Sequence, residues 1–191
     1  DFRNLVDVYM DAVFHPNIYT RPEIFYQEGV TKSLESIDGE LQYNGVVYNE
    51  MKGAFSSPDD VLEREMMNSL YPHTTYGCES GGDPEVIPEL TYEQFLEFHR
   101  KYYHPSNSYI YLYGDMDMEE KLNWLDERYL SKFETCEIDS EIHLQKPFDA
   151  VKEMEMNYSI SSNESEEDNT YLSYNKVIGT SLDRELYQAF Q

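Results

Sequence analysis

The sequence predicts an α/β (α+β) fold, with helices and strands mixed along the chain. Three observations lead to this fold class. Apolar residues recur at helical spacing between Phe2 and Phe14. Helix-capping residues precede later apolar patterns, at Ser57 and Thr91. β-branched and aromatic residues fill the continuous run 109–113, a composition that is typical of strands.

Six segments show a helical pattern, at 2–14, 45–55, 57–70, 91–103, 117–133 and 182–190. Ser57 is expected to cap the third, with Pro58 at its first position and Asp59 facing the positive end of the helix dipole. Thr91 and Gln94 have the spacing of a capping box for the fourth. Glycine and asparagine inside 45–55 weaken the helical pattern of that segment.

Three segments are expected to be strands, at 109–113, 154–160 and 170–178. A polar, acidic stretch separates the last two, so we expect them to pair as a hairpin. Residues 71–90 are rich in glycine and proline and are expected to form a loop. Residues 134–150 carry scattered charge and Pro147, a composition that favours a linker between two structural units.

The charge of the chain is strongly negative, because 38 acidic residues stand against 14 basic ones and the net charge is −24. Phosphate backbones and anionic lipid surfaces would be repelled, so we exclude nucleic acid and membrane as partners. We favour solubility as the role of the charge, and attraction of basic peptides into an acidic cleft is the alternative. Cys78 and Cys136 lack metal or redox spacing, so free thiols are expected, with a disulfide as the alternative.

Several catalytic motifs are missing from the sequence. None of the five histidines has another histidine four residues away, so neither H-E-x-x-H nor H-x-x-E-H is present. Those zinc motifs need two imidazoles one helical turn apart. There is also no G-x-S-x-G elbow, no Walker A loop and no glycine-rich dinucleotide fingerprint.

Three sequence blocks together resemble the pitrilysin/insulinase (M16) family of zinc metallopeptidases, and within it the presequence-protease branch. The blocks are YNGVVYNEMKG at 43–53, YGCESGGDP at 76–84 and FHRKYYHPSN at 98–107. The resemblance implies an antiparallel sheet covered by helices, repeated in units that enclose a chamber. It assigns residues 1–138 to the C-terminal part of a first α/β unit, and 139–191 to a linker and the start of a second.

The same resemblance makes Glu50 the third protein ligand of a zinc ion, beside two histidines of an H-x-x-E-H motif that these residues lack. A carboxylate among the apolar neighbours of Glu50 also needs a cation or metal as its partner. The implied activity is zinc-dependent hydrolysis of short unfolded peptides. No catalytic residue is expected in the chain itself, which should therefore be inactive alone and hold no stoichiometric zinc. A non-catalytic peptide-binding or scaffold module of the same fold is the alternative.

Both ends of the chain fall inside helical patterns, so we expect an internal fragment, and the remaining units of the same polypeptide are its expected partners. A cytoplasmic location is expected, or an organelle if a targeting segment precedes Asp1. Glycines at 81–82 are assigned to a rigid connection, with substrate contact as the alternative. His99 is expected to pack on its helix, His104 to bond within a turn, and His73 to face solvent.

Overall fold

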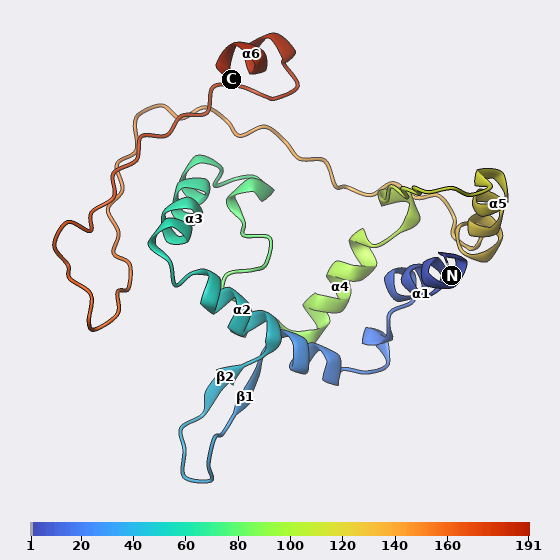
Figure 1. Cartoon of the computed structure of the whole chain (residues 1–191), viewed down its shortest axis with the longest axis horizontal. Coiled ribbons are helices and arrows are strands. Elements are labelled where there is room, and N and C mark those ends of the chain that lie inside the picture. Colours follow the sequence, from blue (N-terminus) through green and yellow to red (C-terminus); the bar gives the residue numbers. More distant parts are fainter. Residues whose placement is uncertain (1) are drawn as a thin grey trace. The chain divides into compact units, whose positions relative to one another are not determined.

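A computed structural model describes residues 2–191 of the chain (Figure 1). Helices dominate, and the described residues form one sheet of two short antiparallel strands. The regular elements are α1 (Phe2–Phe14), β1 (Thr31–Ser33), β2 (Gln42–Asn44), α2 (Val46–Ala54), α3 (Pro58–Leu70), α4 (Tyr92–Tyr102), α5 (Met118–Arg128) and α6 (Arg184–Phe190). Short 3-10 or π-helical turns lie at Asn17–Tyr19, Phe25–Gly29, Thr75–Gly77, Ile87–Glu89, Pro105–Asn107 and Leu130–Lys132.

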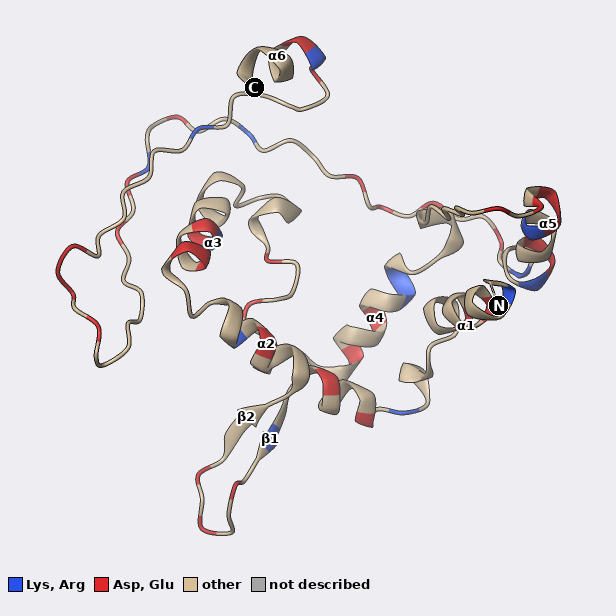
Figure 2. Ribbon diagram, viewed as in Figure 1, with Lys and Arg blue, Asp and Glu red and all other residues tan. Residues whose placement is uncertain are grey.

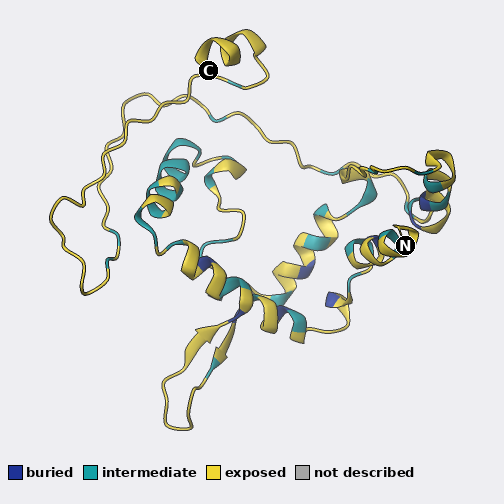
Figure 3. Cartoon of the chain, in the orientation of Figure 1, coloured by how far each residue is buried: buried dark blue, intermediate teal, exposed yellow. Residues whose placement is uncertain are grey.

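The chain contacts itself within two compact units. The first combines the residues up to Asn49 with Pro84–Glu141, and the second combines Glu50–Asp83 with Ile142–Gln191. Helix α2 begins in the first unit and continues in the second. Burial is concentrated on the helices and the turns between them, whereas most residues after 140 are exposed (Figure 3).

The core of the first unit lies between α1 and α5. Met10, Leu125 and Tyr129 are buried there, and the latter two are each only 2% exposed. Val6 and Phe14 of α1 pack against this cluster, so part of the apolar stripe that the spacing of the first helix predicts is buried. Leu5 and Tyr9 belong to the same stripe and are exposed.

A polar contact closes one side of this core. The Tyr129 hydroxyl donates to the Asp7 carboxylate at 2.6 Å and to the Asp7 carbonyl at 2.7 Å. Arg128 adds an ion pair to the same carboxylate at 3.2 Å. Burial, and then the bond to Asp7, raise the pKa of Tyr129 to about 12. The hydrogen bonds from Tyr129 and Arg128 lower the pKa of Asp7. The contact therefore joins α1 to the end of α5.

Helix α4 begins with the expected capping box. The Thr91 hydroxyl accepts the Gln94 N–H at 3.2 Å, and the Gln94 side chain accepts the Thr91 N–H at 2.8 Å. Leu96 is buried on this helix, and the Phe25 ring packs 5.4 Å from the Phe95 ring. A capped N-terminus and an aromatic contact together fix α4 within the first unit.

Local signals also place the ends of two other helices. The Ser57 hydroxyl accepts the Asp60 N–H at 3.3 Å at the start of α3. The Asp117 carboxylate accepts the Glu120 N–H at 3.0 Å at the start of α5. The Ser57 cap confirms the sequence prediction, and the Asp117 cap lies at the residue where the predicted helical pattern begins. Helix α5 ends at Arg128, so the helical pattern that extends to 133 overestimates its length.

The three strands expected at 109–113, 154–160 and 170–178 are wrong for the described residues, which show no ladder hydrogen bonds there. Residues 109–113 do alternate as a strand would, because Leu112 packs on the core whereas Tyr111 and Tyr113 are exposed. Two contacts remain between the segments of the expected hairpin. Tyr158 donates to the Asn169 carbonyl at 2.6 Å, and its ring lies 5.7 Å from the Tyr171 ring. A strand exists only when a neighbour supplies its hydrogen bonds, so β-type composition alone does not produce one.

The only paired strands of the described residues, β1 and β2, were not foreseen. Thr31 pairs with Asn44 and Ser33 with Gln42, antiparallel. Their residues are mostly polar and exposed, so the sequence has no alternation of apolar and polar residues that would predict these strands. Lys32 lies 5.6 Å from the Tyr43 ring across the pair, a cation–π contact that favours this register.

Acidic residues are spread over helices and extended segments alike (Figure 2). Among residues 2–191, no helix has the length and apolar character that crossing a bilayer requires.

Candidate functional site

Helix α2, which carries Glu50, starts from a fixed turn. The Asn44 carboxamide oxygen accepts the Gly45 N–H at 2.9 Å and the Asn49 side-chain amide at 2.7 Å. This Asn44–Asn49 bridge ties the end of β2 to the second turn of α2. It also explains why asparagine inside the helix is tolerated, because its side chain gains a partner that offsets its modest helix propensity.

Gly45 is required at this turn. A Cβ there would lie 2.2 Å from the Gly29 carbonyl oxygen, and its φ of 157° disfavours a side chain. The backbone of the turn therefore packs directly on the residues just before β1. Neither feature was predicted from the sequence, although the short spacing of Asn44, Gly45 and Asn49 is a signal for them.

Glu50 is exposed on α2, while the next residue, Met51, is buried. Among residues 2–191 its carboxylate has no hydrogen-bond or ion-pair partner. Apolar neighbours do not surround this carboxylate, because Val46 is exposed, Val47 and Phe55 are half-buried, and Met51 alone among them is fully buried. Glu50 is thus an available oxygen ligand rather than a desolvated charge.

A complete zinc site does not fit the described residues. No group of three histidine, cysteine, aspartate or glutamate side chains is close enough to hold a metal ion within 2–191. Structural and catalytic zinc sites use three or four protein ligands. Glu50 can supply one ligand, and residues 2–191 do not place a set of three ligands around it.

The histidines of the first unit are engaged in packing. His99 Nε2 donates to the Val13 carbonyl at 3.1 Å, and its Nδ1 then accepts the Tyr19 hydroxyl at 2.7 Å. The Tyr103 ring stacks on it at 4.6 Å. His104 Nδ1 accepts the N–H two residues on, within a turn, at 3.1 Å. The expected structural roles of both histidines are confirmed, and the His73 residue is exposed as expected.

Cys78 and Cys136 are free thiols and both are exposed. The Cys136 sulfur lies 3.4 Å from His104 Nδ1, and the Cys136 N–H donates to the Ser106 hydroxyl at 3.2 Å. Cys78 belongs to the second unit, where it lines a pocket.

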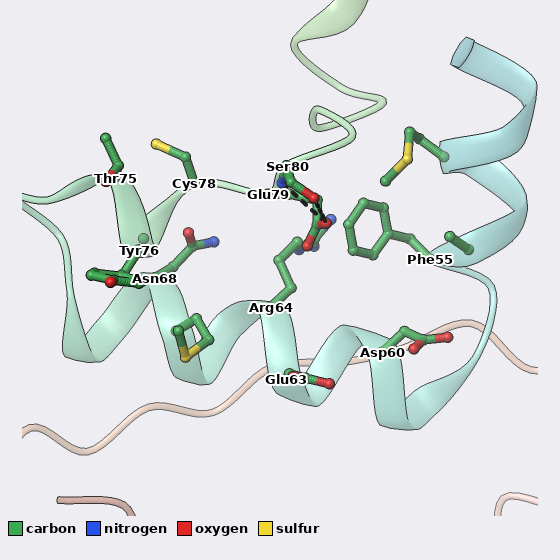
Figure 4. A pocket seen from close by; sticks show the side chains of 14 residues that line it. Phe55, Asp60, Glu63, Arg64, Asn68, Thr75, Tyr76, Cys78, Glu79 and Ser80 are labelled. Atoms are coloured by element: carbon green, nitrogen blue, oxygen red, sulfur yellow. Dashed lines mark hydrogen bonds between the residues drawn. The ribbon is translucent and has the colours of Figure 1, made fainter. Parts of the chain in front are cut away.

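That pocket lies within the second unit, between the end of α2, helix α3 and the loop at 75–80, and its volume is about 450 Å³ (Figure 4). Apolar side chains come from all three elements, and the principal ones are Met51, Phe55, Met67 and Tyr76. Asp60, Glu63 and Glu79 add carboxylates. Its size falls within the range of ordinary ligand sites.

Two glycines bring the loop close to the helices. A Cβ at Gly81 would lie 2.2 Å from the Met51 sulfur, and one at Gly77 would lie 2.3 Å from the Tyr71 carbonyl oxygen. The rigid connection expected for this glycine-rich loop therefore has a specific form. Its backbone packs against α2 and against the end of α3, and so forms one wall of the pocket.

Arg64 is the only cation lining the pocket among the described residues. Its guanidinium lies 4.7 Å from the centre of the Phe55 ring and pairs with Glu65 at 2.9 Å and with Asp83 at 4.0 Å. Figure 4 shows the end of its side chain beside the Phe55 ring. Because Glu65 and Asp83 already balance its charge, the remaining lining of the pocket is net acidic.

Comparison with known proteins identifies the family. The chain belongs to the M16 peptidases, because residues 89–191 match the family model described as "Peptidase M16 inactive domain". It is 55% identical over 190 residues to Protein HypA of Clostridium perfringens (strain 13 / Type A), and this match covers 100% of the chain. The resemblance inferred from the three sequence blocks is therefore confirmed.

Two presequence proteases are also similar to the chain. It is 50% identical over 150 residues to Presequence protease 1, chloroplastic/mitochondrial, of Arabidopsis thaliana, a match that covers 78% of the chain. It is 43% identical over 152 residues to Presequence protease, mitochondrial, of Danio rerio, again over 78% of the chain. The chain spans only 20%, 14% and 15% of the lengths of these three relatives.

Proposed function

We propose that the chain is part of a zinc-dependent endopeptidase that hydrolyses short unfolded peptides in an enclosed chamber. Within it, Glu50 is one of three protein ligands of the zinc ion. The observation that carries this proposal is an exposed carboxylate without a partner among residues 2–191, on a helix whose start is fixed by the Asn44–Asn49 bridge. The kinship with presequence proteases supports the reaction class.

Zinc in such a site supplies a Lewis acid and a water of lowered pKa. The chain's own contribution is to hold one oxygen ligand in place. The Asn44–Asn49 bridge and the close packing of Gly45 on Gly29 fix the first turn of α2, and that turn directs Glu50. Residues that hold a metal ligand in its orientation typically change metal affinity about 10- to 100-fold when they are removed.

Residues 1–138 then form the C-terminal part of a first α/β unit, and residues 139–191 form a linker and the start of a second. The two histidine ligands and the general base belong to other parts of the same polypeptide. The isolated chain is inactive in this proposal, since a single carboxylate does not hold zinc.

A non-catalytic peptide-binding or scaffold module is the second candidate. The match of residues 89–191 to an inactive domain favours it for that part of the chain. Glu50 lies outside the matched residues, so the match leaves the proposed role of this carboxylate untouched.

The test measures zinc content and peptide hydrolysis of the full-length protein after dialysis against zinc and then against buffer. Glu50→Gln keeps the size of the side chain but removes its charge, and we expect it to lose both bound zinc and hydrolysis of a short fluorogenic peptide. Glu97→Gln, at an exposed position of α4, is the matched control and keeps both. Retention of zinc and activity by Glu50→Gln would overturn the ligand role. A full-length protein that binds the peptide, but does not bind zinc and does not cleave the peptide, would support the scaffold module.

A further inference from the structure

We propose that Cys136 and His104 form a reactive thiol–imidazole pair, at which an uncharged or cationic low-molecular-weight disulfide modifies the cysteine. The Cys136 sulfur lies 3.4 Å from His104 Nδ1. The cysteine is exposed to solvent and the histidine is half-buried. Both residues belong to the first unit and neither is a proposed zinc ligand, so the modification requires neither zinc binding nor peptide hydrolysis.

Contacts on both sides of Cys136 hold its sulfur beside the imidazole. The Cys136 N–H donates to the Ser106 hydroxyl at 3.2 Å, and the Ser140 hydroxyl donates to the Asn107 side-chain oxygen at 2.6 Å. The Phe133 ring lies perpendicular to the imidazole, with the ring centres 5.3 Å apart. These contacts join the chain at 133–140 to the turn that follows α4, so the thiol and the base are positioned by the fold.

The imidazole is oriented to take the proton of the thiol. His104 Nδ1 accepts the Ser106 N–H at 3.1 Å, so this nitrogen carries the lone pair of the neutral ring. When the sulfur attacks, its proton moves to Nδ1, and the Ser106 N–H, which is exposed, bonds to water instead. A new S–S bond forms between Cys136 and one sulfur of the disulfide, while the original S–S bond breaks. The leaving sulfur takes the proton and departs as a thiol, so the disulfide is the only oxidant consumed.

The surroundings of the pair select the reagent. Cys78 is the only other cysteine of the chain, and both thiols are free. The mixed disulfide at Cys136 therefore persists until an external thiol reduces it. Glu134 and Glu137 flank Cys136 and are exposed, and the net charge of the chain is −24. Their field repels an anionic disulfide, whereas an uncharged or cationic disulfide approaches without this penalty.

The test compares two cysteines of the full-length protein. The protein reacts at pH 7 with 2-hydroxyethyl disulfide, which is uncharged, and mass spectrometry of quenched digests follows the mixed disulfides at Cys136 and Cys78 separately. Cys78 is the internal control, because it is exposed and its sulfur has no hydrogen-bond partner among residues 2–191. We expect Cys136 to react at least about tenfold faster, since a positioned base typically contributes about 100-fold or more in enzymes.

Oxidised glutathione, which is anionic, serves as the second disulfide. Each rate at Cys136 is divided by the rate of N-acetyl-cysteine amide with the same disulfide, which removes the difference in intrinsic reactivity between the two reagents. We expect the smaller ratio for oxidised glutathione. A larger ratio would overturn the selection by charge.

A variant of the base separates its action from simple exposure. His104→Asn removes the imidazole but keeps a side-chain oxygen that accepts the Ser106 N–H, so the turn is retained. We expect the rate of Cys136 to fall to about that of Cys78, whose own rate stays unchanged. His143→Asn, the same substitution at an exposed histidine of the other unit, is the matched control and should alter neither rate. Equal rates of the two cysteines in the wild type, or an undiminished rate of Cys136 in His104→Asn, would overturn the reactive pair.

Discussion

Gly77 is the position where the pocket wall is most sensitive to one added carbon. It ends the short turn Thr75–Gly77, and a Cβ there would lie 2.3 Å from the Tyr71 carbonyl oxygen and 3.0 Å from the Tyr71 carbonyl carbon. An ordinary contact begins at 3.4 Å, so the overlap with the oxygen is 3.4 − 2.3 = 1.1 Å. Both atoms belong to the backbone, and the same carbonyl already accepts the Thr74 N–H at 3.2 Å. The loop must therefore move away from the end of α3 when alanine replaces Gly77.

Overpacking of this kind destabilises by about 1–3 kcal/mol. Gly53→Ala is the matched control, because Gly53 lies in α2 and a Cβ there meets nothing within 4 Å. In that helix, alanine should stabilise by about 0.5–1 kcal/mol relative to glycine. The same chemical change is thus expected to have opposite signs at two positions of the same unit.

Hydrogen exchange of the backbone amides in α3 and in the turn at 75–78 measures this difference. We expect Gly77→Ala to accelerate exchange there by about 5- to 150-fold, the factor that corresponds to a loss of 1–3 kcal/mol. Gly53→Ala should leave it unchanged or slow it. Equal exchange in the two variants would refute the reasoning, because it would mean that the loop relieves the overlap freely.

Three further predictions concern the core of the first unit. Leu125→Ala should lower the free energy of unfolding of this unit by about 2–4 kcal/mol in denaturant, because Leu125 is only 2% exposed and the shorter side chain leaves a cavity. A decrease of less than about 1 kcal/mol would contradict the close packing of Leu125. Asp7, whose pKa is lowered in the fold, contributes stability above its unfolded pKa of about 3.9 that is lost as the pH falls, so Asp7→Asn should flatten the acid limb of a stability profile. Tyr129, whose pKa is raised to about 12, contributes stability that is complete below its unfolded pKa of about 10 and disappears as the pH approaches 12. Tyr129→Phe should abolish that alkaline loss and lower stability at neutral pH by about 1 kcal/mol, and an unaltered alkaline profile would contradict the assignment.

The helices can be predicted from the sequence because their capping interactions are local. Ser57, Thr91 and Asp117 each bond to an N–H three residues later, so the information needed for the cap lies within one turn of chain. The match of the first two motif blocks to α2 and to the loop at 75–80 is equally local. Family membership followed from the same short segments and was confirmed by comparison.

Pairing and exposure depend on the rest of the molecule. Residues 109–113 have the composition of a strand but no partner strand among the described residues, whereas the polar segments at 31–33 and 42–44 do pair. The reason is that a hydrogen-bond ladder needs two strands at the right distance from each other. The sequence by itself determined the helices, their caps and the candidate ligand Glu50. Only the tertiary structure decided that Glu50 is exposed, that Asn44 holds its helix, and that Met51, Arg64 and the loop at 75–80 enclose one acidic pocket. These features are contacts between segments that are separate in the sequence. Whether such a contact forms depends on the distance and orientation of both segments, which neither segment determines by itself.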